Sequence, residues 1–194
     1  MKKVILILLL NHSIFYSQKF TSWGIKAGYI KSQIIGDNYN GFNKQGFNLG
    51  IFSQLKLSDK SNLQLEIIFV NKGCSDKRDK NYGYKYYSYI DILYYIEVPI
   101  LFQYNYKKIY FEGGPSLALL IWNLDFESTN AGYLSTSPQF TDISFNFGFG
   151  YLYDKRLNLG LRYSNSIIPM RRTPTSQYNS LFSLSLSYKI GFKK

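Results

Sequence analysis

The sequence has very little of the chemistry that enzymes use, because its 194 residues include one cysteine and one histidine. Cys74 has no intrachain partner for a disulfide, and we interpret it as a loop thiol rather than a redox centre. The histidine, His12, lies close to the start of the chain, and none follows it. This argues against a Ser-His hydrolase and against a histidine metal site. We therefore expect no catalytic residues, no metal and no cofactor.

A long apolar run is also absent. After residue 10 no segment approaches the roughly 20 apolar residues that a membrane-spanning helix needs. The one apolar run near the start, residues 4–10, is short and follows Lys2 and Lys3. A basic flank before a short apolar core is typical of a secretory signal. We predict a signal peptide over residues 1–17, which leaves residues 18–194 as the exported domain.

Acidic residues are scarce, with 12 Asp and Glu against 23 Lys and Arg and a formal net charge of +11. A strongly basic chain is one sign of nucleic-acid binding. Here, however, the basic residues lie in the connections between apolar segments, as at Lys107, Lys108, Lys155 and Arg156, and do not gather on one face. With an export signal in front, this pattern indicates contact with lipid phosphates. We expect no nucleic-acid partner.

Aromatic residues, by contrast, are plentiful: 19 Tyr and 15 Phe make up most of an aromatic fraction of 19%. Many recur at every second position, most clearly between residues 140 and 163, where Phe145, Phe147 and Phe149 alternate with polar residues or glycine. A period of two is that of a β-strand, whose successive side chains point to opposite faces. So long an apolar face needs cover, either from a second sheet or from lipid.

Eight segments show this alternation: residues 23–29, 47–57, 63–69, 92–104, 109–121, 143–153, 157–163 and 182–192. Short connections at 58–61, 107–108 and 154–156 alternate with long ones at 31–45, 71–88, 123–139 and 165–177. Outer-membrane barrels have short turns on one side and long loops on the other, and their closure pairs every backbone polar group within the lipid. We therefore predict an all-β fold, an eight-stranded antiparallel up-and-down transmembrane β-barrel in the cell outer membrane.

The polar faces of these segments would fill the lumen, because an eight-stranded barrel is only wide enough inside for its own side chains. Buried charges are costly unless they are paired. We therefore predict an ion-pair network in the lumen, with Lys26, Glu66, Glu97, Glu112 and Arg162 at similar depths in its centre and Lys189 as a further member. The alternative reading of the three glutamates is acid–base catalysis at shifted pKa. We favour packing of the lumen.

Five short motifs follow one another along the chain: Gly24-Ile25-Lys26-Ala27-Gly28, Leu63-Gln64-Leu65-Glu66, Tyr95-Ile96-Glu97-Val98-Pro99-Ile100-Leu101, Gly114-Pro115-Ser116 and Leu161-Arg162-Tyr163. In this order they resemble the PorT-like outer-membrane β-barrel family of Gram-negative bacteria, that is, an outer membrane protein beta-barrel domain. The closing Tyr188, Ile190 and Phe192 resemble the C-terminal signal that the barrel-assembly machinery reads. The resemblance implies the architecture more than an activity, and the name-giving member is implicated in protein secretion.

Such a barrel would have a structural or interaction role through its extracellular loops, with an accessory part in secretion or surface adhesion as the two specific options. The expected partners are outer-membrane lipid, lipopolysaccharide, the barrel-assembly machinery during insertion and a protein at the loops. A tyrosine-rich stretch over residues 82–89, with Lys80 and Lys85, fits a partner surface and contact with lipopolysaccharide equally. Three alternatives stay open: a secreted lipocalin-like ligand-binding barrel with its apolar face inward, a carboxylate-dependent outer-membrane enzyme and a small channel.

Overall fold

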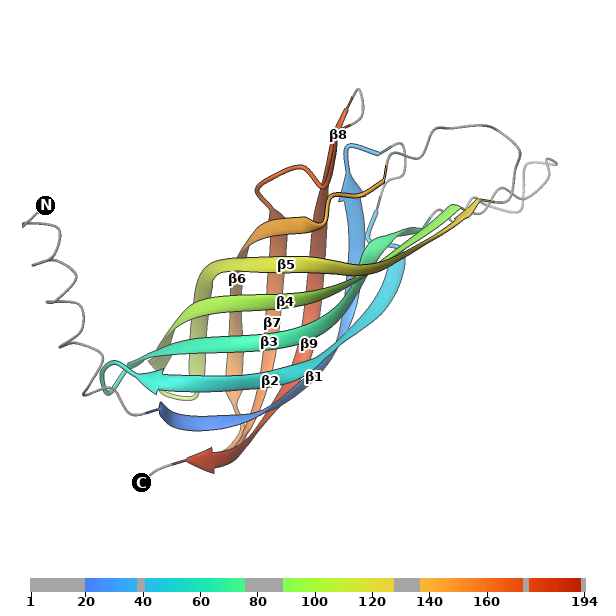
Figure 1. Ribbon diagram of the computed structural model, residues 1–194. Helices are drawn as coiled ribbons and strands as arrows, with labels where there is room; N and C mark the ends of the chain where they lie inside the picture. Colours follow the sequence, from blue (N-terminus) through green and yellow to red (C-terminus); the bar gives the residue numbers. More distant parts are fainter. Residues whose placement is uncertain (1–19, 38–40, 76–88, 128–136, 173–174, 193–194) are drawn as a thin grey trace, which may run out of the picture.

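The computed structural model describes residues 20–37, 41–75, 89–127, 137–172 and 175–192 (Figure 1). Most of them lie in β-strands, which are, in chain order, β1 (Phe20–Ile35), β2 (Lys44–Lys56), β3 (Ser61–Ser75), β4 (Tyr89–Tyr106), β5 (Ile109–Glu127), β6 (Thr141–Leu152), β7 (Leu157–Ser166), β8 (Arg171–Arg172) and β9 (Ser176–Phe192). Within these ranges the structure has no helix long and apolar enough to cross a membrane.

The sheet closes into a barrel because β1 has a hydrogen-bonded neighbour on each side. Ile25 of β1 lies opposite Ile51 of β2 and also opposite Tyr188 of β9. All neighbours are antiparallel, and each barrel strand from β1 to β7 pairs with the next, with β9 closing the circle. The two-residue strand β8 pairs only with the start of β9, Arg171 opposite Gln177, and is not part of the wall. The predicted eight-stranded antiparallel barrel is confirmed.

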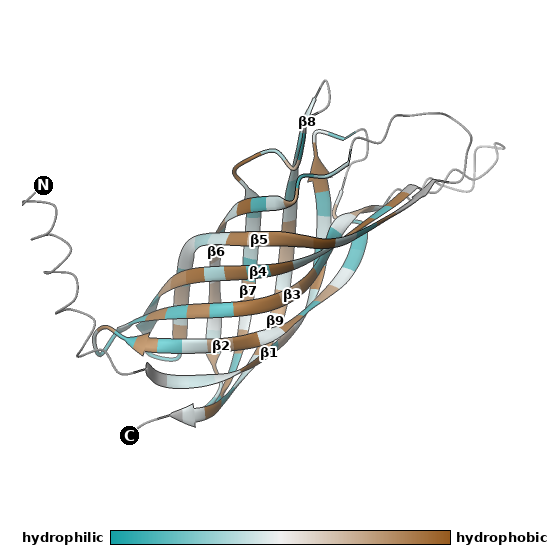
Figure 2. Cartoon of the chain, in the orientation of Figure 1, coloured by the Kyte–Doolittle hydropathy of each residue, from teal (hydrophilic) through white to brown (hydrophobic). Residues whose placement is uncertain are grey.

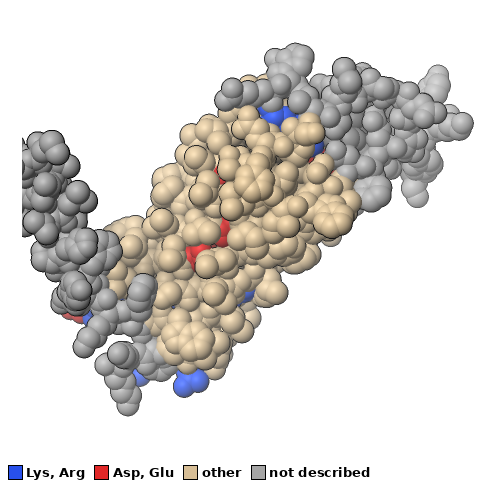
Figure 3. Space-filling view, viewed as in Figure 1, with Lys and Arg blue, Asp and Glu red and all other residues tan. Residues whose placement is uncertain are grey.

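The two faces of each strand have opposite chemistry, and the apolar face points outward. Phe147 is 61% exposed and Phe149 is 50% exposed, whereas Asn146 between Phe145 and Phe147 is 1% exposed. Figure 2 shows the resulting mixture of hydrophobic and hydrophilic residues along single strands. In the space-filling view of Figure 3, Lys and Arg atoms show mainly toward the two ends of the barrel. A lipocalin-like barrel requires the reverse arrangement, with its apolar face around an internal ligand.

The connections sort by length, as predicted. Tight turns join β2 to β3, β4 to β5 and β6 to β7 at one end, which we call the short-turn end. The start of β1 and the end of β9 lie at this end as well, where Ser22 pairs with Phe192. In the β6–β7 turn, Asp154 Oδ1 accepts hydrogen bonds from the backbone N–H groups of Arg156 and Leu157, at 2.6 and 2.7 Å. These bonds lower the pKa of the Asp154 carboxyl.

At the opposite end, which we call the loop end, several strands run further than the sequence pattern indicates. Strand β5 has 19 residues and β4 has 18. The pairing of β4 with β5 continues to Tyr89 and Glu127, whereas the pairing of β5 with β6 stops at Leu119 and Thr141. The ends of β4 and β5 therefore project as a ribbon beyond the end of β6, with β3 paired to β4 as far as Ile90 (Figure 1).

Glycines in the short-turn half of the lumen make room for Tyr110, which is 7% exposed. A Cβ atom on Gly150 would lie 2.3 Å from Cζ of Tyr110, and one on Gly160 would lie 2.5 Å from its hydroxyl oxygen. Gly150→Ala is therefore expected to lower the free energy of unfolding by about 1–3 kcal/mol through overpacking. The measurement is the urea midpoint of the folded, heat-modifiable band on a gel.

Gly113→Ala is the matched control for this prediction. A Cβ atom on Gly113 meets only the carbonyl oxygen of Asn146, at 3.6 Å, so its effect should stay within about 0.5 kcal/mol. Equal urea midpoints for the two variants would contradict the tight packing of Tyr110 on Gly150.

Candidate functional site: the filled lumen and its outer rim

A four-membered ion-pair network crosses the lumen. The guanidinium of Arg162 (β7) binds Glu66 (β3) through two hydrogen bonds of 2.8 Å each, Nη1 to Oε2 and Nη2 to Oε1. Its Nε lies 2.7 Å from Oε1 of Glu112 (β5). Nζ of Lys26 (β1) completes the network at 3.0 Å from Oε1 of Glu66. Two cations balance two anions, so the network as a whole is neutral.

Glutamine amides extend this network toward the short-turn end. Gln64 Nε2 donates to Glu66 Oε1 at 2.5 Å, and Gln103 Nε2 donates to Glu112 Oε2 at 3.0 Å. Gln54 links the two, because its Nε2 donates to both glutamine carbonyl oxygens, at 2.7 and 2.8 Å. The carboxylates therefore have donors besides their ion-pair partners, which is the condition under which buried charges are tolerated.

Glu97 does not join this network but belongs to a second cluster. Its Oε2 lies 2.7 Å from Nζ of Lys72, which is also 3.4 Å from Oδ2 of Asp142. The register explains the separation, because Glu97 lies opposite Ile68, two residues beyond Glu66 toward the loop end. Our assumption that the three glutamates share one depth was wrong for Glu97, and Lys72 was missing from the predicted network.

Hydroxyl and amide groups complete the second cluster. Ser116 Oγ donates to Glu97 Oε1 at 2.6 Å, and Ser166 Oγ donates to Asp142 Oδ1 at the same distance. Asn179 Nδ2 donates to Asp142 Oδ2 at 3.0 Å. The two carboxylates are thus held by one ammonium and three neutral donors.

Lys189 is not a member of either cluster. It lies half-buried near the short-turn end, where its backbone N–H donates to the carbonyl oxygen of Arg156 at 2.8 Å. Within the described part of the chain, no carboxylate oxygen lies within 4.0 Å of its ammonium. Its place at the end of β9 keeps it away from the glutamates, so this part of the prediction was wrong.

The loop-end half of the lumen is filled by apolar side chains. Its members are Ile30, Ile34, Val70, Cys74, Leu93, Tyr95, Ala118 and Met170. Met170 comes from the β7–β9 connection, which folds inward, its carbonyl oxygen accepting from Gln139 N–H at 2.7 Å. Beside it, Arg171 forms an ion pair with Asp91. Cys74 is therefore a buried core thiol rather than a loop thiol, and burial raises its pKa.

The described residues contain no group of three or more His, Cys, Asp or Glu side chains placed to hold a metal ion. Glu66, Glu97 and Glu112, whose alternative reading is acid–base catalysis, are each bound by a cation and at most 6% exposed. A substrate therefore has no direct access to them. The arrangement holds charge in place and fills space.

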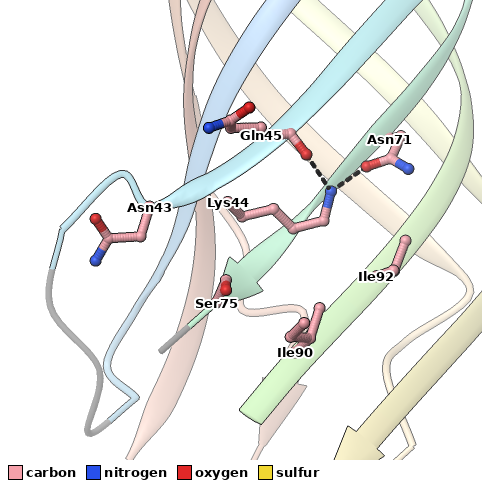
Figure 4. A pocket seen from close by; sticks show the side chains of 7 residues that line it. All are labelled: Asn43, Lys44, Gln45, Asn71, Ser75, Ile90 and Ile92. Atoms are coloured by element: carbon pink, nitrogen blue, oxygen red, sulfur yellow. Dashed lines mark hydrogen bonds between the residues drawn. The ribbon is translucent and has the colours of Figure 1, made fainter. Parts of the chain in front are cut away.

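A recess opens at the rim of the loop end, where β2 separates from β3. Pairing of these strands ends at Asn48 and Val70. Beyond that point lies a cavity of about 320 Å³, lined by Asn43, Lys44, Gln45, Asn71, Ser75, Ile90 and Ile92. Figure 4 shows Lys44 lying across it, its Nζ donating to the Gln45 carbonyl oxygen at 3.0 Å and to Asn71 Oδ1. Burial lowers the pKa of Lys44 to about 8.

Two sequence predictions fall outside the described residues. They are the signal peptide over residues 1–17 and most of the tyrosine-rich stretch, residues 82–88, with Lys80 and Lys85.

A closed barrel with apolar side chains outside and ion pairs sealed inside is a transmembrane β-barrel, a class that occupies outer membranes. The chain belongs to the outer membrane protein beta-barrel domain family, whose model matches residues 16–172. It is therefore an outer-membrane protein, and proteins of this class have their short turns in the periplasm and their long loops outside.

Two solved structures show the same fold at low sequence identity. Neisserial surface protein A is similar at 15% identity and a TM-score of 0.54, over 87% of this chain and 97% of that one. The attachment invasion locus protein Ail of Yersinia pestis is similar at 11% identity and a TM-score of 0.50, over 89% of this chain and 100% of that one. No curated protein matches the sequence.

Proposed function

We propose that this protein is a non-conducting outer-membrane barrel with a structural or interaction role at its outer end, and that it is not an enzyme. The observation that carries the proposal is the filled lumen. From the periplasmic side outward, the lumen holds the Glu66–Arg162 network, the Lys72 cluster and the apolar cluster around Met170. An interior packed at three successive levels leaves the outer end as the working surface.

The projecting ribbon of β4 and β5 supports an interaction role. Ile121 is 55% exposed and Trp122 is 63% exposed, and both lie beyond Leu119, where β5 loses β6 as a neighbour. Apolar and aromatic side chains outside the barrel wall are suited to a protein partner. An accessory part in secretion, as the PorT-like resemblance implies, and surface adhesion are the two specific forms that we propose for this role.

The route to the membrane is also part of the proposal. Residues 1–17 would be removed as a signal peptide, and the end of β9, with Tyr188 and Ile190, would be read by the barrel-assembly machinery. Both side chains lie on the lipid-facing side of the wall, at 40% and 45% exposed. N-terminal sequencing of the protein extracted from outer membranes tests the cleavage site, and a mature chain that begins at Met1 would contradict it.

The filled lumen predicts no stable unitary conductance in planar lipid bilayers. Protein that keeps its heat-modifiable band after reconstitution, and is therefore folded, should leave the membrane current at its baseline. Discrete, reproducible conductance steps from the folded protein would overturn the non-conducting function and favour the small channel instead.

A further inference from the structure

We infer that the recess between β2, β3 and β4 binds the phosphate group of an outer-leaflet lipid, with Lys44 as the cationic contact. This inference deepens the proposed function and rests on it, because it requires the recess to lie on the outer side of a barrel in lipid. The general expectation that outer-membrane lipid is a partner rests on the composition of the chain, whereas the recess is one defined binding site.

The polar groups of the recess are suited to an anion. Lys44 has three N–H donors, and its acceptors among the described residues are Gln45 O and Asn71 Oδ1. Within that part of the chain, one donor remains for a ligand. Asn71 accepts through Oδ1 and donates its amide N–H groups to no described residue, and Ser75 adds a hydroxyl. The seven lining residues that the structure describes include no Asp or Glu. A phosphate group, bound by an ammonium and neutral donors, fits this set.

The surrounding charges favour an anion as well. Lys31 of β1 lies opposite Gln45 in the register and is exposed, which places a second cation at the rim. Asp91, on β4, is the nearby carboxylate that acts on Lys44, and it is bound to Arg171. Cys74, on β3, also faces Lys44, but burial raises the pKa of its thiol and keeps it neutral.

The depth of the recess points to a lipid rather than to a free anion. Phe47, Phe69 and Tyr94 form an aromatic row across β2, β3 and β4, with ring centroids 5.9 and 5.7 Å apart. Aromatic rows of this kind mark the interface between hydrocarbon and headgroups. Asn71 follows Phe69 by two residues on the same face, about 7 Å further along the strand. The recess thus lies at the depth of lipid phosphates.

The apolar lining provides for the rest of the lipid. Figure 4 shows Ile90 and Ile92 of β4 lining the recess together with Lys44. They precede Tyr94 by four and two residues, so they lie on the same face of the strand as this member of the aromatic row. An acyl chain lying along the row would bring its headgroup phosphate to the ammonium. A free phosphate would use the polar groups but leave the two isoleucines without a partner.

The test measures binding of a phosphorylated lipid to the full-length mature barrel in detergent micelles, by native mass spectrometry. The probes are bis-phosphorylated lipid A, the same lipid after removal of its phosphates and inorganic phosphate. Lys44→Gln should weaken binding of lipid A about tenfold or more, the effect of one lost charged hydrogen bond. Lys108→Gln, at an exposed lysine of the periplasmic turn, is the matched control and should bind like the unsubstituted protein.

Lys44→Arg separates the charge from the rest of the side chain. It should keep lipid binding and hold it constant as the pH rises from about 7 to about 10. The unsubstituted protein should lose affinity over that range, because burial lowers the pKa of its lysine to about 8 and the ammonium deprotonates, whereas burial raises the pKa of Cys74 and keeps that thiol neutral. The exposed Lys31 is present in both proteins, so its contribution to lipid binding does not affect the comparison between them.

Three results would overturn the inference. Equal lipid A affinity of Lys44→Gln and the unsubstituted protein would show that Lys44 is not part of the site. Equal binding of the dephosphorylated lipid would show that the recess does not recognise the phosphate group. Displacement of lipid A by inorganic phosphate at similar concentration would show that the recess binds a free anion. Should Lys44→Gln not fold, the pH comparison with Lys44→Arg decides. Heat-modifiability and bilayer recordings test the proposed function separately, so its failure is distinguishable from failure of this site.

Discussion

Arg162→Met is expected to lower the free energy of unfolding by about 3–5 kcal/mol, because it leaves buried carboxylates without their main cation. Arg162 makes two hydrogen bonds to Glu66 and one to Glu112, and without it one ammonium, from Lys26, faces both carboxylates. The network would change from neutral to a net charge of −1. Urea unfolding of the barrel in lipid vesicles, followed by the heat-modifiable band or tryptophan fluorescence, gives the value.

Two comparisons make this result specific to the network. Adding Glu112→Gln to Arg162→Met leaves Lys26 with Glu66, a balanced pair, and should recover part of the lost stability. Lys56→Met breaks the exposed pair of Lys56 and Asp59 at the periplasmic turn, 2.7 Å apart, and should change stability by less than about 1 kcal/mol. Simple additivity of the first two substitutions would show that Arg162 and Glu112 do not act together.

Phe147→Arg should have the next largest effect, about 2–4 kcal/mol, because a cation on the lipid face near the middle of a strand meets hydrocarbon. Phe147 is 61% exposed at the middle of β6, so in water the same substitution would cost little. Folding yield and urea unfolding in vesicles of defined thickness measure the difference.

Tyr153→Arg is the matched control, since Tyr153 is 69% exposed just beyond the end of β6 at the periplasmic side. Its cost should be at most about 1 kcal/mol, as for a cation at the membrane interface. If Phe147→Arg proved as mild as Tyr153→Arg in vesicles, the wall at β6 would not be in contact with acyl chains.

The barrel could be predicted because its signals are local. The alternation of Phe145, Phe147 and Phe149 with small or polar neighbours reports which residues share a face, whatever the strand pairs with. The difference between tight turns such as 107–108 and the long connections reports the orientation of the strands. Closure then follows, because an open edge in lipid leaves backbone groups unpaired.

The partners inside the lumen were predictable only in part. The alternation of side chains along a strand predicts which residues face inward, and the structure brings together four of them, Lys26, Glu66, Glu112 and Arg162. This alternation does not give the depth of a residue along the barrel axis, however, because tilted strands shift neighbouring residues along that axis. The register alone moves Glu97 out of the network and to the side of Lys72.

The loop end was the least predictable part, because its contacts join segments that are far apart in the chain. Met170 fills the lumen mouth from a connection with no strand periodicity of its own, and Cys74 is buried beside it rather than exposed in a loop. The recess at Lys44 exists because β2 and β3 separate beyond Asn48 and Val70, and no local pattern marks that point.

By itself the sequence determined that the chain forms a closed barrel, which faces of its strands meet lipid and that Lys26, Glu66, Glu112 and Arg162 face inward, because alternation and turn length are properties of neighbouring residues. The tertiary structure alone decided which cation holds which carboxylate, how the mouth is closed and where a recess remains at the outer rim. These depend on the tilt and register of eight strands at once, and so on distances that no single segment contains.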